Sequence, residues 1–240
     1  MGTVLDRRTL AGEATKERLL DAGERLFADG GLDGVSVRAI AAAAGVDLAM
    51  INYHFGSKEG LYRAVFHRRA GPLNALRLET LDHVLVASNG SPDVELVVFA
   101  SVEPYLRLRN SPTLGGLPFS RLLVREAIDP MERERGILRE NFDEVASRIV
   151  DAMSRALPGA TRRGLIWAYH FMVGTLLLTM ADTGRLEELS NGECKTADVK
   201  DVLRHIVPFI ASGIRAALNR EGSDEWLSRL DALRLHGGRS

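Results

Sequence analysis

Apolar residues recur at steps of three and four along most of the chain, the spacing that places side chains on one face of an α-helix. Strict alternation of apolar and polar residues, the pattern of a half-buried strand, is scarce, and runs of β-branched residues are short. The pattern therefore predicts an all-α protein. In the first helical segment the apolar positions are Leu19, Leu20, Ala22, Gly23, Leu26 and Phe27.

Residues that can cap a helix alternate with glycines in the first 60 positions. Glycine adopts the left-handed backbone that ends a helix at little cost, so these glycines are expected to separate short helices. The predicted N-caps are Thr15, Ser36, Asp47 and Ser57, the predicted stops are Gly30-Gly31 and Gly45, and the predicted helices after the first cover 37–44, 48–54 and a longer segment from Lys58.

Further helical patterns follow, separated by segments rich in Gly, Pro, Asn and Ser. Gly71-Pro72 interrupts the fourth pattern without ending it, and the first strong break is at 87–92. Thr161 is expected to cap a later helix, and Pro208 to kink another. These breaks predict a helical domain over 1–70 and a larger one over 71–240. The helices expected in the second are 93–109, 118–128, 132–157, 162–183, 196–218 and 223–235.

The composition is that of a globular protein, but the charge argues against a nucleic-acid partner at first. The 240 residues are 45% hydrophobic, and 31 Lys and Arg face 32 Asp and Glu, a formal net charge of -1. Nucleic-acid-binding proteins usually carry a basic excess. From Ser36 to Arg69, however, five basic residues against two acidic ones leave a local charge of +3, which favours phosphate binding by one face. The basic residues are Arg38, Lys58, Arg63, Arg68 and Arg69.

Several classes of protein are disfavoured. Cys194 is the single cysteine, which excludes an internal disulfide and a cysteine-rich zinc site. No GxSxG, P-loop or GxGxxG motif occurs, nor a His, Cys and Asp cluster with metal spacing, so neither a catalytic residue, a cofactor nor a metal is expected. The first 20 residues lack the apolar core of a signal peptide, and no run of about 18 apolar residues is present. A cytoplasmic protein without a membrane partner is expected.

The most informative segment is VSVRAIAAAAGVDLAMINYHFGSKEGLYRAVF, residues 35–66. Ala41 is small where two short helices would cross, Gly45 supplies a turn with positive φ, and Ile51 can fill the junction. This spacing predicts a helix-turn-helix that reads DNA, although a plain helical hairpin would satisfy it as well.

In a helix-turn-helix, the second helix enters the major groove with its N-terminal half toward the base edges. Asn52 can pair with adenine, and Leu48 and Ala49 can touch a thymine methyl. Other candidates are expected to reach phosphates, with Lys58 beside a positive helix end. Tyr53 and Phe55 could instead be core residues, and Ser36 a cap alone. The candidate DNA-binding residues are Ser36, Arg38, Leu48, Ala49, Asn52, Tyr53, His54 and Lys58.

Together with LLDAGERLFADGG before it, this segment resembles the N-terminal DNA-binding signature of TetR-type transcriptional regulators, from about Thr15 to Phe66. The resemblance implies an all-helical homodimer, usually a repressor, with a divergent ligand-binding domain after the first three or four helices. Asp47 replaces the small polar residue that is frequent in the family, which affects the expected operator rather than the DNA-binding class. Residues 119–153 resemble the C-terminal domain of the YbiH/CecR type.

A ligand-responsive regulator needs a second site, and a coupling of about 1–3 kcal/mol between the sites is enough. Aromatic residues of the second domain could form this pocket, or could simply be core. The candidates are Tyr105, Phe119, Trp167, His170 and Phe171.

The predicted helix 162–183 is apolar over most of its circumference and must be covered on every side. With the amphipathic helix 199–218 it is expected to form half of a four-helix interface in a homodimer. The sequence thus predicts a regulator, repressing through a palindromic double-stranded operator that a small-molecule effector releases. A helical binding or scaffold protein that keeps the helix-turn-helix only as structure is the second interpretation, and an enzyme the third.

Overall fold

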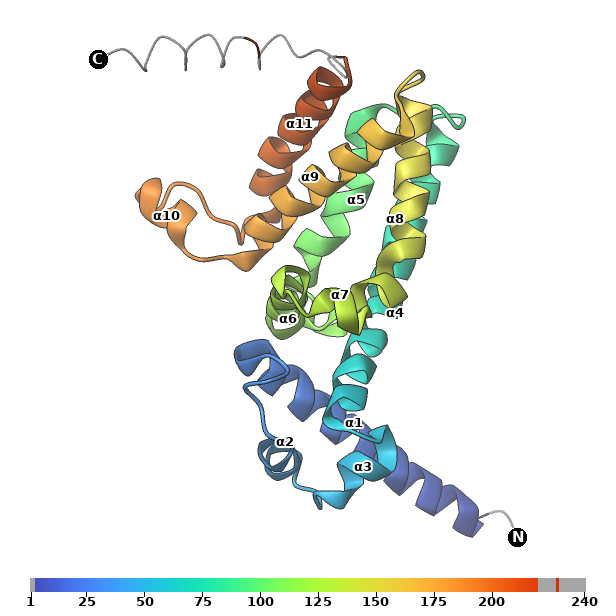
Figure 1. Cartoon of the computed structure of the whole chain (residues 1–240), viewed down its shortest axis with the longest axis vertical. Coiled ribbons are helices and arrows are strands. Elements are labelled where there is room, and N and C mark those ends of the chain that lie inside the picture. The colour runs from blue at the N-terminus through green and yellow to red at the C-terminus, as the bar shows by residue number, and fades with distance from the viewer. Residues whose placement is uncertain (1–2, 220–227, 229–240) are drawn as a thin grey trace.

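A computed structural model describes residues 3–219 and residue 228, and these residues contain helices and no strand (Figure 1). The all-α prediction is confirmed. The helices are α1 (Thr3–Gly30), α2 (Val37–Ala44), α3 (Ala49–Phe55), α4 (Lys58–Ala87), α5 (Val94–Leu108), the 3-10 turn η1 (Pro112–Leu114), α6 (Gly116–Ile128), α7 (Glu132–Arg135), α8 (Ile137–Ala156), α9 (Arg162–Ala181), α10 (Arg185–Leu189) and α11 (Val199–Leu218).

Helices α1, α2 and α3 pack with the first turns of α4 at one end of the molecule (Figure 1). The apolar stripe predicted on α1 is the buried face, and Leu19, Ala22 and Phe27 have no exposed surface. Phe27 meets Tyr62 of α4 edge to face, with the ring centroids 4.9 Å apart. This small core holds the helix-turn-helix on α1 and α4.

Two of the four predicted N-terminal caps are confirmed, and Asp47 lies one position before the N-cap residue of α3, Leu48. The side chains of Ser36 and Ser57 accept hydrogen bonds from backbone N–H groups three residues on, at 3.1 and 3.0 Å. Asp47 Oδ1 accepts from Ala49 N at 2.7 Å, just before α3. The prediction for Thr15 is wrong, because residues before it continue the helix to Thr3 and its hydroxyl donates to Ala11 O within α1.

Helix α4 is continuous through Gly71-Pro72 and joins the two parts of the chain. Its first turns belong to the helix-turn-helix unit, and its later turns pack against α5 and α8. The predicted domain boundary at residue 70 falls inside α4, and it stays a prediction.

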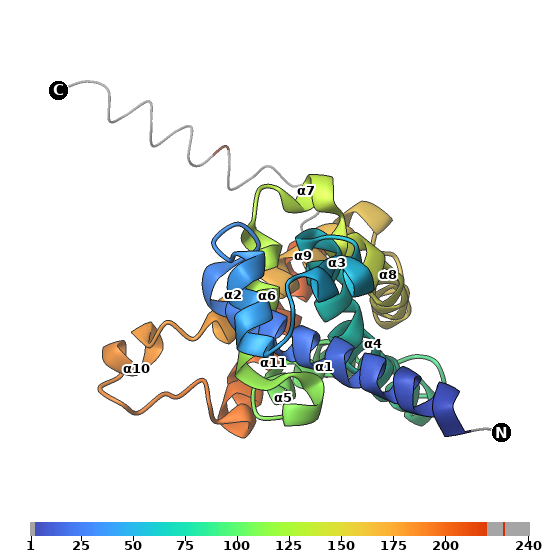
Figure 2. The ribbon, with the colours of Figure 1, turned by 90° about the horizontal axis from the view of Figure 1, so that it is seen from below.

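Above the N-terminal unit, α5 and α8 pack on the later turns of α4, α9 and α11 pack against α5 and against each other, and α6 and α7 lie across the junction (Figure 1). The predicted helix 132–157 is wrong as a single element, because Gly136 adopts a positive φ of 67° between α7 and α8. The segment between α9 and α11 contains the unforeseen α10 and projects from the body (Figures 1 and 2). The predicted helix 223–235 lies outside the described residues.

Candidate functional site

The turn between α2 and α3 is built as the sequence predicts. Gly45 lies in the left-handed region, with φ 62° and ψ 42°, and Val46 N donates to Ala41 O at 3.1 Å. Ile51, 1% exposed, anchors α3 in the core beside the buried Ala41. Arg18 of α1 donates to Gly45 O at 3.4 Å and so holds the turn from outside. These contacts fix the orientation of α3 at the lower end of the molecule (Figure 2).

With Ile51 turned inward, α3 exposes the other face that the sequence assigns to DNA. Leu48, Ala49 and Asn52 are exposed, and Tyr53 is 78% exposed. Tyr53 is therefore not a core residue, whereas Phe55 packs partly against the core. The exposed face offers an amide, a phenol and apolar atoms, which are the groups that meet base edges and the groove wall.

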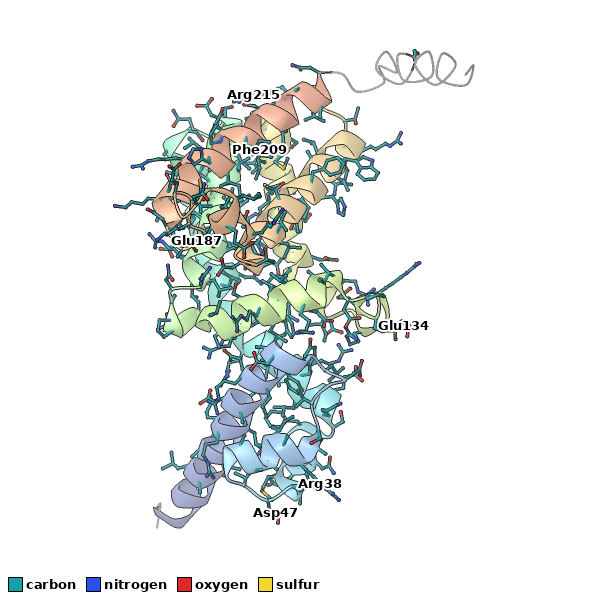
Figure 3. The ribbon with its side chains drawn as sticks, turned by 90° about the vertical axis from the view of Figure 1, so that its left-hand side faces the viewer. Arg38, Asp47, Glu134, Glu187, Phe209 and Arg215 are labelled. Carbon is teal, nitrogen blue, oxygen red and sulfur yellow. The ribbon has the colours of Figure 1, made fainter. Side chains whose placement is uncertain are left out.

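The remaining candidates surround this face. Ser36 and Arg38 are exposed at the start of α2, and Figure 3 places Arg38 at the end of the molecule farthest from the C-terminal domain. His54 and Lys58 are half-buried, and Lys58 Nζ donates to Val35 O at 3.1 Å. All eight candidates thus lie on or beside α2 and α3.

The local charge of +3, however, does not describe this face, and that interpretation is corrected. Arg63, Arg68 and Arg69 lie where α4 packs against α1 and α8, so their guanidinium groups bind carboxylates at 2.6–3.1 Å. Of the five basic residues, only Arg38 and Lys58 remain beside the exposed face of α3, which we call the reading face. The carboxylate partners are Glu17, Asp21 and Glu24 of α1 for Arg68 and Arg69, and Glu59 and Glu140 for Arg63.

One further cation was not predicted. A shallow groove of about 370 Å³ runs between α1 and α3, and Lys16 lines it together with Tyr53 and His54. The signal in the sequence was only that Lys16 falls on the polar side of the first helical pattern. Its ammonium group lies near the exposed tyrosine, and the acidic Glu13 lines the same groove.

A buried polar cluster joins the helix-turn-helix unit to the C-terminal domain. Glu126 of α6 has no exposed surface, accepts from Tyr62 Oη at 2.8 Å and receives two hydrogen bonds from Arg135 at 3.0 Å. Arg135 also lies 2.8 Å from a carboxylate oxygen of Asp129. Burial, and then the hydrogen bond to Glu126, raise the pKa of the Tyr62 hydroxyl, so that it remains a hydrogen-bond donor. Side-chain hydrogen bonds at this one buried carboxylate therefore link α4, α6 and α7.

The five ligand candidates do not line one cavity. Phe119 is completely buried, with its ring 5.7 Å from that of Phe66. Tyr105 lies within the C-terminal domain, where the guanidinium of Arg77 is 4.6 Å from its ring centroid. Arg77 was not among the residues that the sequence indicated, because a single arginine in an amphipathic helix carries no special signal. The other candidates, Trp167, His170 and Phe171, are exposed.

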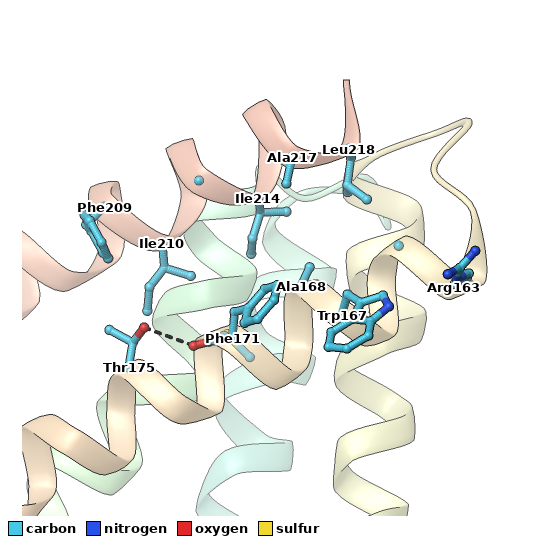
Figure 4. Close-up of a pocket in the computed structure, with 13 residues that line it drawn as sticks. Arg163, Trp167, Ala168, Phe171, Thr175, Phe209, Ile210, Ile214, Ala217 and Leu218 are labelled. Atoms are coloured by element: carbon cyan, nitrogen blue, oxygen red, sulfur yellow. Dashed lines mark hydrogen bonds between the residues drawn. The ribbon is translucent and has the colours of Figure 1, made fainter. Parts of the chain in front are cut away.

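Trp167 and Phe171, but not His170, line an apolar groove of about 650 Å³ between α9 and α11 (Figure 4). One stripe of α9 is buried in the domain, whereas Trp167 and Phe171 stack on its outer side, 5.5 Å apart. Phe209 of α11 is 70% exposed on the same surface. By length and composition α9 could also cross a membrane, but a helix of a globular protein passes the same test.

Two family profiles match the chain. Residues 19–65 match "Bacterial regulatory proteins, tetR family", and residues 100–213 match "Tetracyclin repressor-like, C-terminal domain". Over 103 residues the chain is 34% identical to the HTH-type transcriptional regulatory protein RaaS of Mycobacterium tuberculosis, which covers 41% of this chain and 45% of the relative.

A second relative is the HTH-type transcriptional dual regulator CecR of Shigella flexneri, 45% identical over 56 residues, or 23% of this chain and 25% of the relative. The chain thus spans less than half the length of the curated relatives it matches. Because the CecR match is short, the resemblance of residues 119–153 to the YbiH/CecR type stays a prediction.

The fold also matches a solved structure of a transcriptional regulator, FadR from Bacillus subtilis in complex with stearoyl-CoA. The TM-score is 0.57 at 17% identity, and the match covers 82% of this chain and 98% of the other. At this identity the likeness concerns the fold.

Proposed function

The chain belongs to the TetR family of bacterial regulatory proteins, and we propose that it is a homodimeric repressor whose palindromic operator is released by a small-molecule effector. As a member of the family it is a transcriptional regulator with a DNA-binding helix-turn-helix and a C-terminal ligand-binding domain. The repression, the operator release and the effector are the parts that we propose.

The observation that carries the proposal is the division of α3 into two faces. Ile51 is buried, while Asn52 and Tyr53 on the adjoining positions are exposed together with Leu48. A seven-residue helix with one buried face and one exposed face suits insertion into a major groove. Bases and phosphates would cover the exposed phenol and amide.

The exposed apolar surface of α9 and α11 supports the dimer. Large aromatic side chains on a contiguous exposed surface commonly mark an interface. A second copy related by a twofold axis would place the same two helices over Trp167, Phe171 and Phe209, and would set two α3 helices about one DNA turn apart or a multiple of it. That geometry calls for a palindromic operator.

The route from effector to DNA would run through α4 and α6. α4 carries Lys58 beside the reading face and reaches the core of the C-terminal domain without a break. The hydrogen bond between Tyr62 and Glu126 links it to α6. We therefore propose that an effector in the C-terminal domain displaces these helices and changes the separation of the two reading helices. A coupling of about 1–3 kcal/mol would suffice.

The effector would be a small apolar or amphipathic molecule. The matched FadR structure contains stearoyl-CoA, an amphipathic ligand, and a similar fold could hold a ligand of related character here. The buried side chains of the C-terminal domain are largely apolar, with few polar groups to fix an orientation.

The proposal is tested by selecting sites from a random duplex library at low salt. A palindrome with half-sites about one helical turn apart, or a multiple of it, is expected. Failure to recover any palindromic site would lead us to abandon the repressor function.

The selected operator then tests the contacts. Tyr53→Ala and Lys58→Ala should both weaken binding, and Lys58→Ala should reduce the slope of log affinity against log salt by about 0.9, the contribution of one phosphate. Lys195→Ala, in the exposed segment after α10, is the matched control and should change neither quantity. Unchanged affinity and slope in both test variants would contradict the phosphate contacts.

A further inference from the structure

Arg77 lies in the middle of the C-terminal domain and lacks the partner that a buried cation requires. It is 3% exposed, and no other lysine or arginine among the residues with described side chains is buried to this degree. No carboxylate of those residues lies within ion-pair distance of it. A buried charge without a counter-charge is strongly unfavourable, so its retention in a packed core calls for an explanation.

The other buried charges of the described chain are all neutralised. The buried carboxylate of Glu24 binds Arg68 and Arg69, that of Glu103 binds Arg107, and that of Glu126 binds Arg135. The core therefore pairs its acidic groups and leaves one basic group, Arg77, without a counter-charge. A ligand that neutralised Arg77 would have to carry a negative charge.

The part of the guanidinium without a hydrogen-bond partner is its Nε–Nη2 edge. Nη1 donates to Asn74 Oδ1 at 3.3 Å, and the face of the group lies 4.6 Å from the centroid of Tyr105. Nε is fully enclosed and has no hydrogen-bond partner, and Nη2 makes no hydrogen bond to any described residue. Two parallel N–H groups on one edge are the arrangement that binds both oxygens of a carboxylate.

We propose that Arg77 binds the carboxylate of the effector, and that the effector is an organic acid with an apolar body. This inference rests on the proposed function and specifies its ligand. Tyr105 would hold the guanidinium in place through its ring. The apolar body would lie among the surrounding helices, because the buried residues of α4 and α5 nearby are mostly aliphatic.

The position of Arg77 also gives binding a mechanical consequence. α4 supports the reading face at one end and carries Arg77 on a turn beyond Pro72. Proline cannot donate a backbone hydrogen bond, so α4 is least constrained between these two parts. An acid that enters beside Arg77 must part α4 from α5, and it would move α4 at this point.

The first experiment measures the thermal unfolding and titration calorimetry of the whole protein with benzoate, 4-phenylbutyrate and decanoate, each beside its uncharged primary amide. At least one acid should bind saturably and raise Tm, and its amide should bind roughly 30-fold or more weakly. Inorganic phosphate, which lacks an apolar body, should not raise Tm. Binding by none of the acids, equal binding by an acid and its amide, or comparable binding of phosphate would overturn the proposal.

Two variants assign the effect to Arg77. Arg77→Met keeps the length and apolar volume and should lose the preference for acid over amide. Arg77→Lys keeps the charge without the two-pronged edge and should bind the acid with intermediate affinity. If Arg77→Met binds the acid as tightly as the wild type does, the assignment is overturned. If Arg77→Met does not fold, Arg77→Lys decides, and wild-type affinity in that variant would also count against the proposed edge.

Operator binding without any acid separates this inference from the proposed function. Wild type and Arg77→Lys should both bind the operator. Only the wild type should release it fully at the acid concentration that saturates the wild-type protein. Loss of operator binding by the wild type itself would contradict the proposed function. Intact operator binding without any response to the acids would contradict this inference alone.

Discussion

Glu126 shows how much can depend on one buried side chain. Its carboxylate lies on α6, has no exposed surface, and binds Tyr62 of α4 and Arg135 at the end of α7. Three elements thus meet at one group. In a low-dielectric interior each of these hydrogen bonds is stronger than at the surface, and the cost of breaking them is correspondingly large.

We expect Glu126→Ala to lower the free energy of unfolding by about 3 kcal/mol or more, because it leaves the nearly buried Arg135 and the Tyr62 hydroxyl without their main partner. The matched control is Glu140→Ala, whose carboxylate binds Arg63 at the exposed surface and should contribute less than about 1 kcal/mol. Urea unfolding of both variants measures the difference. Equal losses would show that the cluster is not the stabilising feature that its burial suggests.

At this scale, the sequence predicts what is local. Ser36 and Ser57 cap helices, and Asp47 accepts a hydrogen bond just before α3, from partners two or three residues away, and the spacing is visible in the sequence. The partners of Glu126 and of Arg68 lie up to 64 and 51 residues away and depend on how helices pack. For that reason, the net charge of a segment did not predict the charge of a face.

At the scale of the helices, two glycines differ in backbone conformation: one ends a helix and the other lies inside one. Gly45 has a φ of 62° at the turn before α3, whereas Gly12 lies inside α1 with an ordinary helical backbone. A Cβ added at either position would meet no heavy atom within 4 Å. The comparison therefore isolates backbone conformation from steric contact.

Gly45→Ala should lower the free energy of unfolding by about 1–2 kcal/mol, because an L-residue is strained in the left-handed region. Gly12→Ala should raise it by about 0.5–1 kcal/mol, because alanine loses less backbone entropy in a helix. Chemical denaturation of the two variants should thus give changes of opposite sign. A stabilising Gly45→Ala would mean that the turn relaxes away from the described conformation.

An ion pair between α5 and α11 makes the packing of these helices sensitive to acid. The hydrogen bonds from Arg215, opposed by slight burial, hold the pKa of the Glu95 carboxyl below its ordinary value. A depressed folded-state pKa stabilises the protein above the unfolded-state pKa of about 4.3, and this contribution is lost as pH falls through the folded-state value.

Between pH 6 and pH 3.5, the Tm of the wild type should therefore fall further than the Tm of Glu95→Gln, which has no charge to titrate at this position. Glu79→Gln is the control, since Glu79 is exposed and has no ion-pair partner among the described residues. It should retain the wild-type dependence. Parallel pH curves for Glu95→Gln and the wild type would show that the pair does not stabilise the contact between α5 and α11.

Strong periodicity predicted the existence of the long helices, but not every interruption. Gly136 divides α7 from α8 although the apolar spacing continues across it, because one left-handed residue is enough to change the direction of the chain. α10 has five residues, too few for a helical period to be recognised. Conversely, α4 and α11 continue past Pro72 and Pro208, and both helices pack against α5.

At the scale of the whole molecule, aromatic residues that look alike in the sequence lie in two different environments. Phe119 is enclosed between α6 and α4, whereas Trp167 and Phe171 lie on the outer surface of α9. A helix that is apolar all round indicates that every side is covered, and the structure supplies cover for one side only. The sequence therefore pointed to the helix with an uncovered side, but it could not divide the aromatic residues between buried and exposed positions.

This surface leads to a prediction about assembly. We expect the wild type to have a mass of about 53 kDa in light scattering, twice the 26.3 kDa of one chain, with α9 and α11 of two copies in contact. Phe209→Glu would place a charge in the middle of the apolar contact, where it cannot be solvated, and should give a mass near one chain.

The matched control is Val86→Glu, at an equally exposed apolar position near the end of α4 and away from the groove. It should leave the mass at that of the dimer. Because two linked reading helices bind far more tightly than one, Phe209→Glu should also lose most of its operator affinity while α3 itself remains intact. A monomeric wild type, or a Phe209→Glu variant with unchanged mass, would place the dimer contact elsewhere and leave the groove between α9 and α11 without this partner.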